Sequence, residues 1–222
     1  MSSFVIFMVL GTIETHSIFA LIFCSFWFPY REYLKEITLM AVLVTLCSYL
    51  LRVQLQVNMA IDAAAAFVML ILFLRYMIKV RFWRSVLISL MYFGFAIINS
   101  ATFLLLTTLR IVDSSEVINN SSSLSAYVVQ FVSSMIVFLL AYIIKKKNIG
   151  LSFILRPPHD LMVRKVMNKD EVRIITGVLL ASLILFLGVY GFTNEKTFIA
   201  LPIVIVMYVI LLYLAYKRDN ES

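Results

Sequence analysis

Glu14, His16 and Cys24 are the residues near the start of the chain whose side chains could do chemistry, and all three stand in one apolar run. A cysteine thiolate with an imidazole base within hydrogen-bond reach would be the catalytic pair of a membrane Cys/His peptidase. On a regular helix, the step from His16 to Cys24 turns through about 800° and rises about 12 Å. The two side chains then point about 80° apart and cannot meet. We therefore expect no catalytic residue and no enzyme.

The composition indicates which kind of element holds these residues. Of the 222 residues, 63% are hydrophobic and only 14% are charged, and the mean hydropathy is +1.00. Soluble domains are nearer to about half apolar and about a quarter charged. We expect an integral membrane protein of the all-α class, because a backbone in lipid must satisfy its own hydrogen bonds. The alternating segments of about ten residues that are typical of a membrane β-barrel do not occur in the sequence.

Seven apolar segments have the length and character of membrane-spanning helices. We expect a single transmembrane helical domain over residues 1–222, with a basic cytoplasmic loop at 145–173. The expected helices cover, in order, residues 4–28, 37–54, 57–76, 85–109, 124–144, 174–192 and 198–216. Residues 1–13 contain no Lys or Arg, so the start of the chain does not match a cleavable signal peptide, whose first region is basic.

The distribution of basic residues predicts the orientation. Of the 19 Lys and Arg residues, only Arg52, Arg110 and Lys196 fall on one side of the expected membrane. The positive-inside rule then places the N-terminus outside and the C-terminus in the cytoplasm. This orientation requires an odd number of spans, and seven fits. We therefore expect a multi-pass protein of the cell membrane.

The net charge of +7 indicates contact with anionic lipid headgroups, and nucleic acid is not an expected partner. The headgroup contacts are expected from the basic loop, at Lys145, Lys146, Lys147, Arg164 and Lys165. An ordinary positive-inside loop without specific lipid contacts is the alternative.

Cys24 and Cys47 both lie in apolar runs, which favours two reduced thiols packed like small hydrophobic residues. The sequence contains no zinc-binding spacing, Walker loop, GxSxG, HExxH or dinucleotide-binding fingerprint. We therefore expect neither a metal site nor a cofactor.

Five polar side chains lie inside the expected spans, where such groups are costly and usually face the bundle interior, a partner or water. They are Glu14, His16, Asp62, Asn99 and Gln130. At about 1.5 Å per residue, each falls roughly 18–25 Å from the cytoplasmic end of its helix, in the outer half of a core about 30 Å thick. We predict a polar layer that forms the floor of a ligand-binding cavity open to the outside. The alternatives are structural hydrogen bonds between helices and, for Asp62, a place at the outer interface.

The inner halves of the same helices bear on the class of function. Segments such as FALIFCSFWF and MIVFLLAYII are nearly bare of polar residues, which weighs against a channel or pump formed by one chain. We therefore expect a sensor or receptor module. The alternative is a transport or channel subunit in which Glu14 and Asp62 couple ions or protons.

Three stretches carry a resemblance to a known family. They are ETHSIFALIF followed by PYREYLKEI, then LRYMIKVRFWRSVLIS, and finally KKKNIGLSFILRPP. In these stretches the chain resembles the membrane sensor region of agr-type (GHKL) sensor histidine kinases of Gram-positive bacteria, or a kinase-lacking relative.

The resemblance implies a polytopic receptor in two-component signal transduction, as in quorum sensing. Such a receptor detects an extracellular signal, often a peptide, and its last helix passes the signal to a cytoplasmic kinase. Kinase motifs do not occur in the sequence, so no signalling residue can be transferred. Two interpretations stay open: a stand-alone accessory protein, or a region that a kinase domain follows in the gene. A cytoplasmic or membrane signalling protein and a second copy of the chain are the candidate partners.

Overall fold

The computed structural model describes residues 2–57, 59–80, 82–119 and 123–148. Every regular element in these ranges is a helix, so the all-α prediction is confirmed for them. The sixth and seventh expected spans, at 174–192 and 198–216, lie outside the described residues. The same holds for the basic loop from residue 149 onward, and therefore for Arg164 and Lys165.

The helices follow one another with short connections. They are α1 (Ser2–Ser25), α2 (Leu34–Tyr49), the π-helical turn η1 (Leu50–Gln54), α3 (Met59–Tyr76), α4 (Phe82–Ser89), α5 (Met91–Thr108), α6 (Ser114–Asn119) and α7 (Leu124–Lys146). The expected span at 85–109 is divided into α4 and α5, which meet at Leu90. Helix α1 ends at Ser25, three residues before the boundary expected at Phe28.

Four helical stretches among the described residues are long and apolar enough to cross a membrane, judged by length and composition. They are Phe4–Ser25, Leu34–Gln54, Arg84–Thr108 and Leu124–Lys146. Helix α3 has 18 residues, or about 27 Å of length, and packs against α2 and α4. Long apolar helices of this kind are compatible with a membrane protein.

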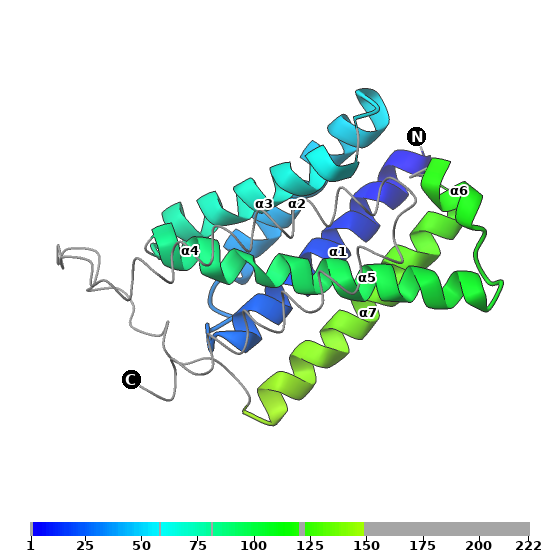
Figure 1. Cartoon of the computed structure of the whole chain (residues 1–222). Coiled ribbons are helices and arrows are strands. Elements are labelled where there is room, and N and C mark those ends of the chain that lie inside the picture. The colour runs from blue at the N-terminus through cyan, green and yellow to red at the C-terminus, as the bar shows by residue number, and fades with distance from the viewer. Residues whose placement is uncertain (1, 58, 81, 120–122, 149–222) are drawn as a thin grey trace.

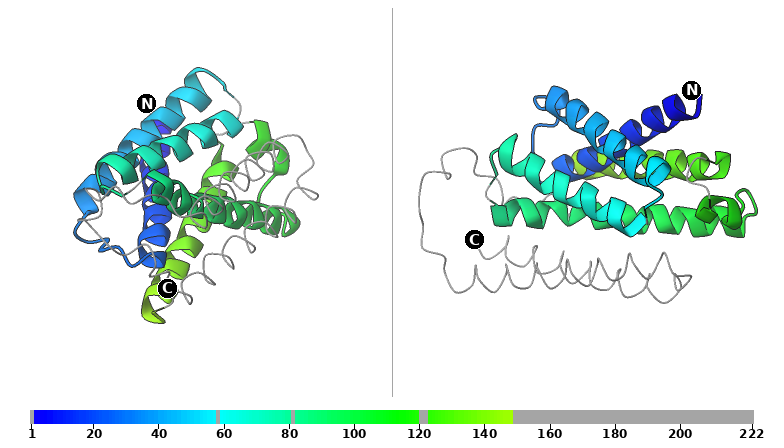
Figure 2. Two further views of the ribbon diagram at one scale, coloured as in Figure 1. Left: turned by 60° about the vertical axis from the view of Figure 1, so that its left-hand side comes forward. Right: turned by 90° about the horizontal axis from the view of Figure 1, so that it is seen from above.

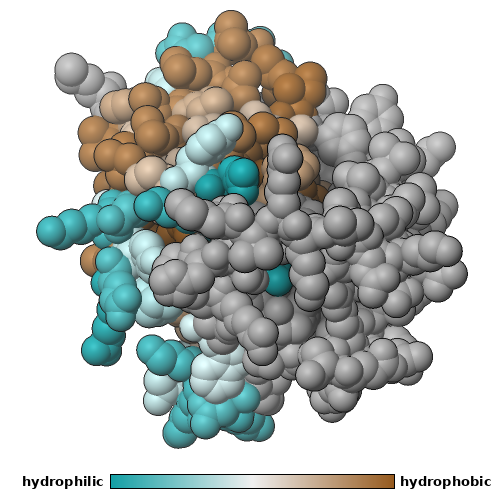
Figure 3. Space-filling model, turned by 90° about the vertical axis from the view of Figure 1, so that its left-hand side faces the viewer, coloured by the Kyte–Doolittle hydropathy of each residue, from teal (hydrophilic) through white to brown (hydrophobic). Residues whose placement is uncertain are grey.

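Helix α1 lies at the centre of the described bundle, where it packs most extensively against α7 and α2 (Figure 1). Successive long helices run in opposite directions, as both views of Figure 2 show. Helices α1, α3 and α7 therefore end where α2 and α4 begin. We call this end of the bundle the basic end, because Arg31, Lys35, Lys79 and Lys145–Lys147 are exposed there. Figure 3 shows hydrophilic side chains beside apolar surface on this side of the molecule.

The long helices end in the same way, with a residue in the left-handed region of φ. These residues are Trp27, Gln56, Lys79, Arg110 and Asn148, with φ between 49° and 61°. The turn lets backbone N–H groups reach carbonyls one turn back, as in the bonds from Phe28 N to Phe23 O at 2.9 Å and from Val80 N to Leu74 O at 3.0 Å. Such bonds satisfy carbonyls that a helix end leaves free. They offset a conformational cost of about 1–2 kcal/mol for a residue other than glycine.

The core at the basic end of α1 is mainly apolar, with Ser25 as a buried polar residue of α1 there. Phe19, Ile22, Phe23 and Phe26 have exposed fractions of 0%, 0%, 0% and 1%. Ile22, Phe23 and Phe26 follow Phe19 by three, four and seven residues, which puts all four on one face of the helix. The Phe19 ring meets the Phe73 ring of α3 edge-on, with centroids 5.0 Å apart. This half of the bundle is closed by tightly packed aromatic side chains.

Small side chains allow α1 and α2 to approach closely in the middle of the bundle. A Cβ atom added at Gly11 would lie only 2.4 Å from Thr45 Cγ2. Thr15 and Ala41, each four residues away from this contact along its own helix, are also buried. Such small-residue contacts are the usual basis of close helix packing in membranes. They bring the polar groups of the two helices within reach of each other.

Candidate functional site: a polar layer between the helices

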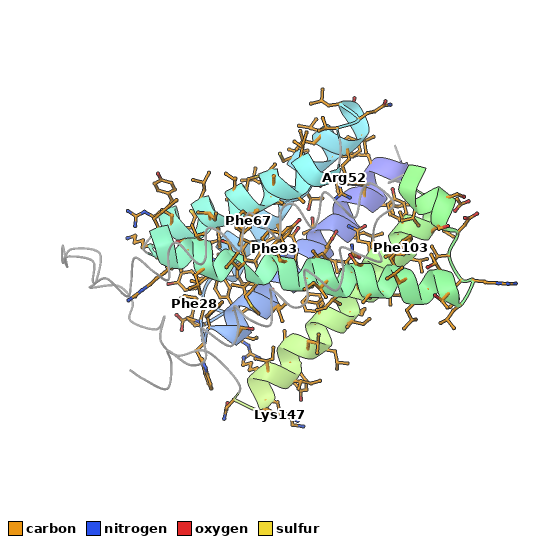
Figure 4. The ribbon with its side chains drawn as sticks, in the orientation of Figure 1. Phe28, Arg52, Phe67, Phe93, Phe103 and Lys147 are labelled. Atoms are coloured by element: carbon orange, nitrogen blue, oxygen red, sulfur yellow. The ribbon has the colours of Figure 1, made fainter. Side chains whose placement is uncertain are left out.

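The closest ionic contact of the described residues joins η1 to α3. Arg52 Nε lies 2.5 Å from Asp62 Oδ2, and Ser48 Oγ donates a hydrogen bond of 3.0 Å to the same oxygen. Asp62 is 4% exposed, whereas the Arg52 side chain is 31% exposed. The guanidinium and the hydroxyl together compensate a carboxylate that would be expensive to bury alone. Figure 4 shows Arg52 far from Lys147, the last basic residue of the α7 terminus.

The local structure of α2 and α3 positions this contact. Asp62 lies in the first turn of α3, where free N–H groups and the helix dipole favour a carboxylate. Arg52 lies in the π-helical turn, which closes with a bond from Leu55 N to Leu50 O at 2.9 Å. Short π-helical segments are rare and frequently occur at functional sites. Arg52 and Ser48, four residues apart, reach the same carboxylate oxygen.

A second polar contact joins α1 to α7. Gln130 Nε2 donates a hydrogen bond to Glu14 Oε2. Glu14 also lies within electrostatic range of Arg52 and Asp62, so the two contacts belong to one polar layer. Since α1 ends at Ser25, Glu14 stands about 16 Å from the basic end of its helix, near the middle, rather than the roughly 21 Å expected from the sequence.

A small pocket of about 50 Å³ lies beside these contacts. A buried water needs about 10–15 Å³ on this measure, so the pocket has room for a few water-sized groups. Its lining comes from α1, α2, α3 and α5, with the residues Gly11, Glu14, Thr15, Ile18, Phe19, Val44, Thr45, Ser48, Ala66, Leu70 and Tyr92. Tyr92 is within electrostatic range of Glu14, Asp62 and Arg52.

The pocket has a polar and an apolar side. Ile18 and Phe19 line it one turn beyond Glu14, toward the basic end, and Leu70 of α3 lines it as well. Beyond them lies the closed aromatic core of α1. Among the described residues, the polar lining therefore does not continue to the basic end.

His16 does not face this layer. Its Nδ1 lies 3.0 Å from the hydroxyl of Tyr30, in the connection between α1 and α2. Burial raises the pKa of the Tyr30 phenol, so the hydroxyl keeps its proton and can donate to the imidazole. The Phe23 ring packs edge-on against Tyr30, with centroids 6.0 Å apart. His16 thus links α1 to the α1–α2 connection, and its Nδ1 is engaged by Tyr30.

Asn99 is also separate from the layer. It lies on α5 and does not line the pocket. Its Oδ1 is buried and finds no hydrogen-bond partner among the described residues. Of the five polar residues singled out in the sequence, the structure therefore brings together Glu14, Gln130 and Asp62.

Sequence reasoning missed several members of the layer. Arg52 lies near the end of the span expected at 37–54 and was counted only as a basic residue on the outer side, whereas it completes the contact with Asp62. Arg52 follows Ser48 by four residues, so the two side chains share one face of the second helix. This spacing is the signal that could have indicated a common partner on α3. Thr45 and Tyr92 had no such signal, because a lone hydroxyl in an apolar helix is common.

The remaining candidate residues lie elsewhere. Lys145, Lys146 and Lys147 are exposed at the end of α7. Cys24 and Cys47 are free thiols of intermediate exposure. In the part of the chain that the structure describes, no three His, Cys, Asp or Glu side chains gather as metal ligands would.

Fold and site together define the described part of the chain as an all-helical bundle, with helices of membrane-spanning length and a layer of polar contacts between them. Comparison with protein-family models, with curated proteins and with solved structures finds no match for the chain.

Proposed function

We propose that the chain is a multi-pass sensor or receptor module of the cell membrane that detects an extracellular signal, such as a peptide, and relays it to a cytoplasmic partner. In this proposal seven helices cross the membrane, with the N-terminus outside and the C-terminus in the cytoplasm. The basic end then faces the cytoplasm, in accord with the positive-inside rule. Its exposed lysines would contact anionic lipid headgroups.

One observation carries the proposal: the pocket is polar on one side and closed by apolar residues toward the basic end. Glu14, Thr45 and Ser48 supply polar groups, while Ile18 and Phe19 separate them from that end. A receptor needs a site that reaches one face of the membrane only. A transporter needs polar groups that continue to the other face. Among the described residues that line the pocket, those toward the basic end, Ile18 and Phe19, are apolar. The buried hydroxyls of Ser25 and Ser85, nearer that end, do not line the pocket.

The polar contacts also provide a means of relay. The Glu14–Gln130 bond joins α1 to α7, and the Arg52–Asp62 pair joins α2 to α3. A ligand that competes for one of these groups would change which helices are held together. Such a differential contact is what shifts a helical bundle between two arrangements.

The functional test compares gene expression in cells that carry the chain with gene expression in cells from which its gene has been deleted. The difference between the two is the response that depends on the chain. Glu14→Gln and Asp62→Asn, each at native expression level, are expected to reduce this response. Glu32→Gln serves as the matched control, because Glu32 is exposed in the α1–α2 connection. An intact response in both pocket variants would exclude the polar layer as the signal site.

A transport or channel subunit that uses Glu14 and Asp62 is the second candidate. Purified protein in liposomes separates the two functions. A sensor should give no Na⁺, K⁺ or H⁺ flux above that of protein-free liposomes. A flux that Glu14→Gln abolishes would favour the transport subunit.

The orientation is tested by cysteine labelling in intact cells, on a background in which Cys24 and Cys47 are replaced by serine. A cysteine at Ser114, exposed at the start of α6, should react with a membrane-impermeant maleimide. A cysteine at Lys146 should react only after the membrane is permeabilised. Labelling of the Lys146 position from outside would overturn the orientation.

A further inference from the structure

Three residues that line the pocket carry hydroxyl groups whose protons are already engaged. Thr15 Oγ1 donates to the Gly11 carbonyl at 2.9 Å, and Thr45 Oγ1 donates to the Ala41 carbonyl at 2.8 Å. Ser48 Oγ donates to Asp62 Oδ2. A hydroxyl has one proton and two lone pairs, so each of these oxygens can still accept but not donate. With the Glu14 carboxylate, these oxygens give a mostly apolar pocket a polar part that can accept from a ligand.

The charges around the pocket do not balance among the described residues. Asp62 is paired with Arg52, whereas the partner of Glu14 is the neutral amide of Gln130. With both carboxylates ionised, two negative charges face one positive charge, which leaves a net charge of −1. An uncompensated charge inside a membrane bundle is expensive. A single positive charge in the pocket would neutralise it.

The size and ligand set of the pocket select the kind of cation. A volume of about 50 Å³ accommodates a small ion with one or two waters. Oxygen ligands suit hard cations, but Ca²⁺ takes six to eight of them and commonly several carboxylates. Among the described residues, Glu14 is the one carboxylate that lines this pocket.

We propose that the pocket binds a monovalent cation of the size of Na⁺, held by the Glu14 carboxylate and the hydroxyl oxygens of Thr15, Thr45 and Ser48. The ion joins α1 to α2 at the level where the Gly11–Thr45 contact brings these helices together. The binding of Na⁺ therefore stabilises the bundle. This site differs from the expectation, drawn from ligand spacing in the sequence, that the chain holds no metal. It does not depend on the proposed sensor function.

The test measures the melting temperature (Tm) of the purified full chain in lipid nanodiscs. NaCl, KCl and N-methyl-D-glucamine chloride are compared at constant ionic strength and pH. Because Na⁺ binds the folded state, the Tm should rise with the logarithm of Na⁺ concentration, and less with K⁺. An equal Tm in NaCl and in N-methyl-D-glucamine chloride would overturn the proposal.

Variants assign the effect to the pocket. Glu14→Gln should abolish the Na⁺ dependence, and Thr45→Val should raise the half-saturating Na⁺ concentration about tenfold, since one oxygen ligand is lost. Glu32→Gln, outside the pocket, should behave as the wild type. If Glu14→Gln does not fold, Thr45→Val and Ser48→Ala decide the question: an unchanged half-saturating concentration in both variants contradicts the site.

A proton on Glu14 is the competing way to neutralise the pocket. In that case the difference in Tm between the wild type and Glu14→Gln would follow pH and would be the same in all three salts. That result would also overturn the proposal. A broadening of the ²³Na resonance by the wild type that Thr45→Val reduces would support it directly.

Discussion

Arg52 Nε lies 2.5 Å from Asp62 Oδ2, so an ion pair joins the end of the second helix to the start of the third. Asp62 is almost fully buried, and Ser48 adds a hydrogen bond to the same oxygen. The pair holds together two helices whose connection is short. Its strength depends on how completely the carboxylate is removed from water.

Replacing Arg52 should expose this dependence. Arg52→Ala leaves Asp62 buried without its cation and should lower the free energy of unfolding by about 3 kcal/mol, near the low end for a buried pair because the guanidinium is partly exposed. Unfolding in mixed micelles with increasing SDS measures the change. Arg31→Ala, at an exposed position, should have little effect. The double variant Arg52→Ala/Asp62→Ala should be more stable than Arg52→Ala alone, because the unpaired carboxylate is removed as well. If the losses in free energy of unfolding of the two single variants simply add in the double variant, the pairing is contradicted.

The bond between Glu14 and Gln130 should contribute less. Gln130→Leu removes the donor between α1 and α7 and should lower the free energy of unfolding by about 1 kcal/mol, which is typical of hydrogen bonds between membrane helices. The same SDS titration measures it. Gln54→Leu is the matched control, because Gln54 is exposed. Equal stabilities of the two variants would show that the bond has no net effect.

The close contact of α1 with α2 predicts a specific steric effect. Gly11→Ala places a methyl group 2.4 Å from Thr45 Cγ2 and should destabilise the bundle by about 1–3 kcal/mol through overpacking. Adding Thr45→Ser, which removes that methyl group and keeps the hydroxyl, should restore much of the loss. Thermal unfolding of the single and double variants tests this pair. A double variant no more stable than Gly11→Ala would place the strain elsewhere.

Tyr30 provides a pH-dependent test of the α1–α2 connection. Burial raises the pKa of its phenol above the usual value of about 10. The folded state then retains a proton that the unfolded state loses, so this contribution to stability is complete below about pH 10 and is lost as the pH rises through the folded pKa. Tyr30→Phe should be less stable by about 1 kcal/mol at pH 8, because the bond to His16 is lost.

The measurement compares the wild type and Tyr30→Phe in SDS titrations between pH 8 and pH 11. The stability difference should shrink toward the upper end of this range. Tyr142→Phe is the control, because Tyr142 is exposed on α7. A difference that is constant with pH would mean that the phenol titrates equally in the folded and unfolded chains.

The sequence by itself determined the helical class of the described residues and the existence of long apolar helices. These properties depend on composition and on the length of apolar runs, which are local quantities. The span expected at 124–144 contains no breaker, for example, and α7 forms over Leu124–Lys146. Glu14 and Gln130 were placed at similar depth because the rise per residue of a helix is nearly constant.

Only the tertiary structure decided which of these polar groups meet. Two residues along a helix turn through about 200°, so Glu14 can face Gln130 while His16 faces Tyr30. The sequence does not contain the rotation of each helix about its axis, because that rotation is fixed by contacts such as Gly11 with Thr45. The span expected at 37–54 already included Arg52, but only the structure shows that this part of the helix is a π-helical turn and that Arg52 meets Asp62. The depth of a residue along its helix follows from the local sequence, whereas the direction of its side chain depends on how the helices pack. The sequence could therefore place polar residues at similar depth but could not say which of them meet.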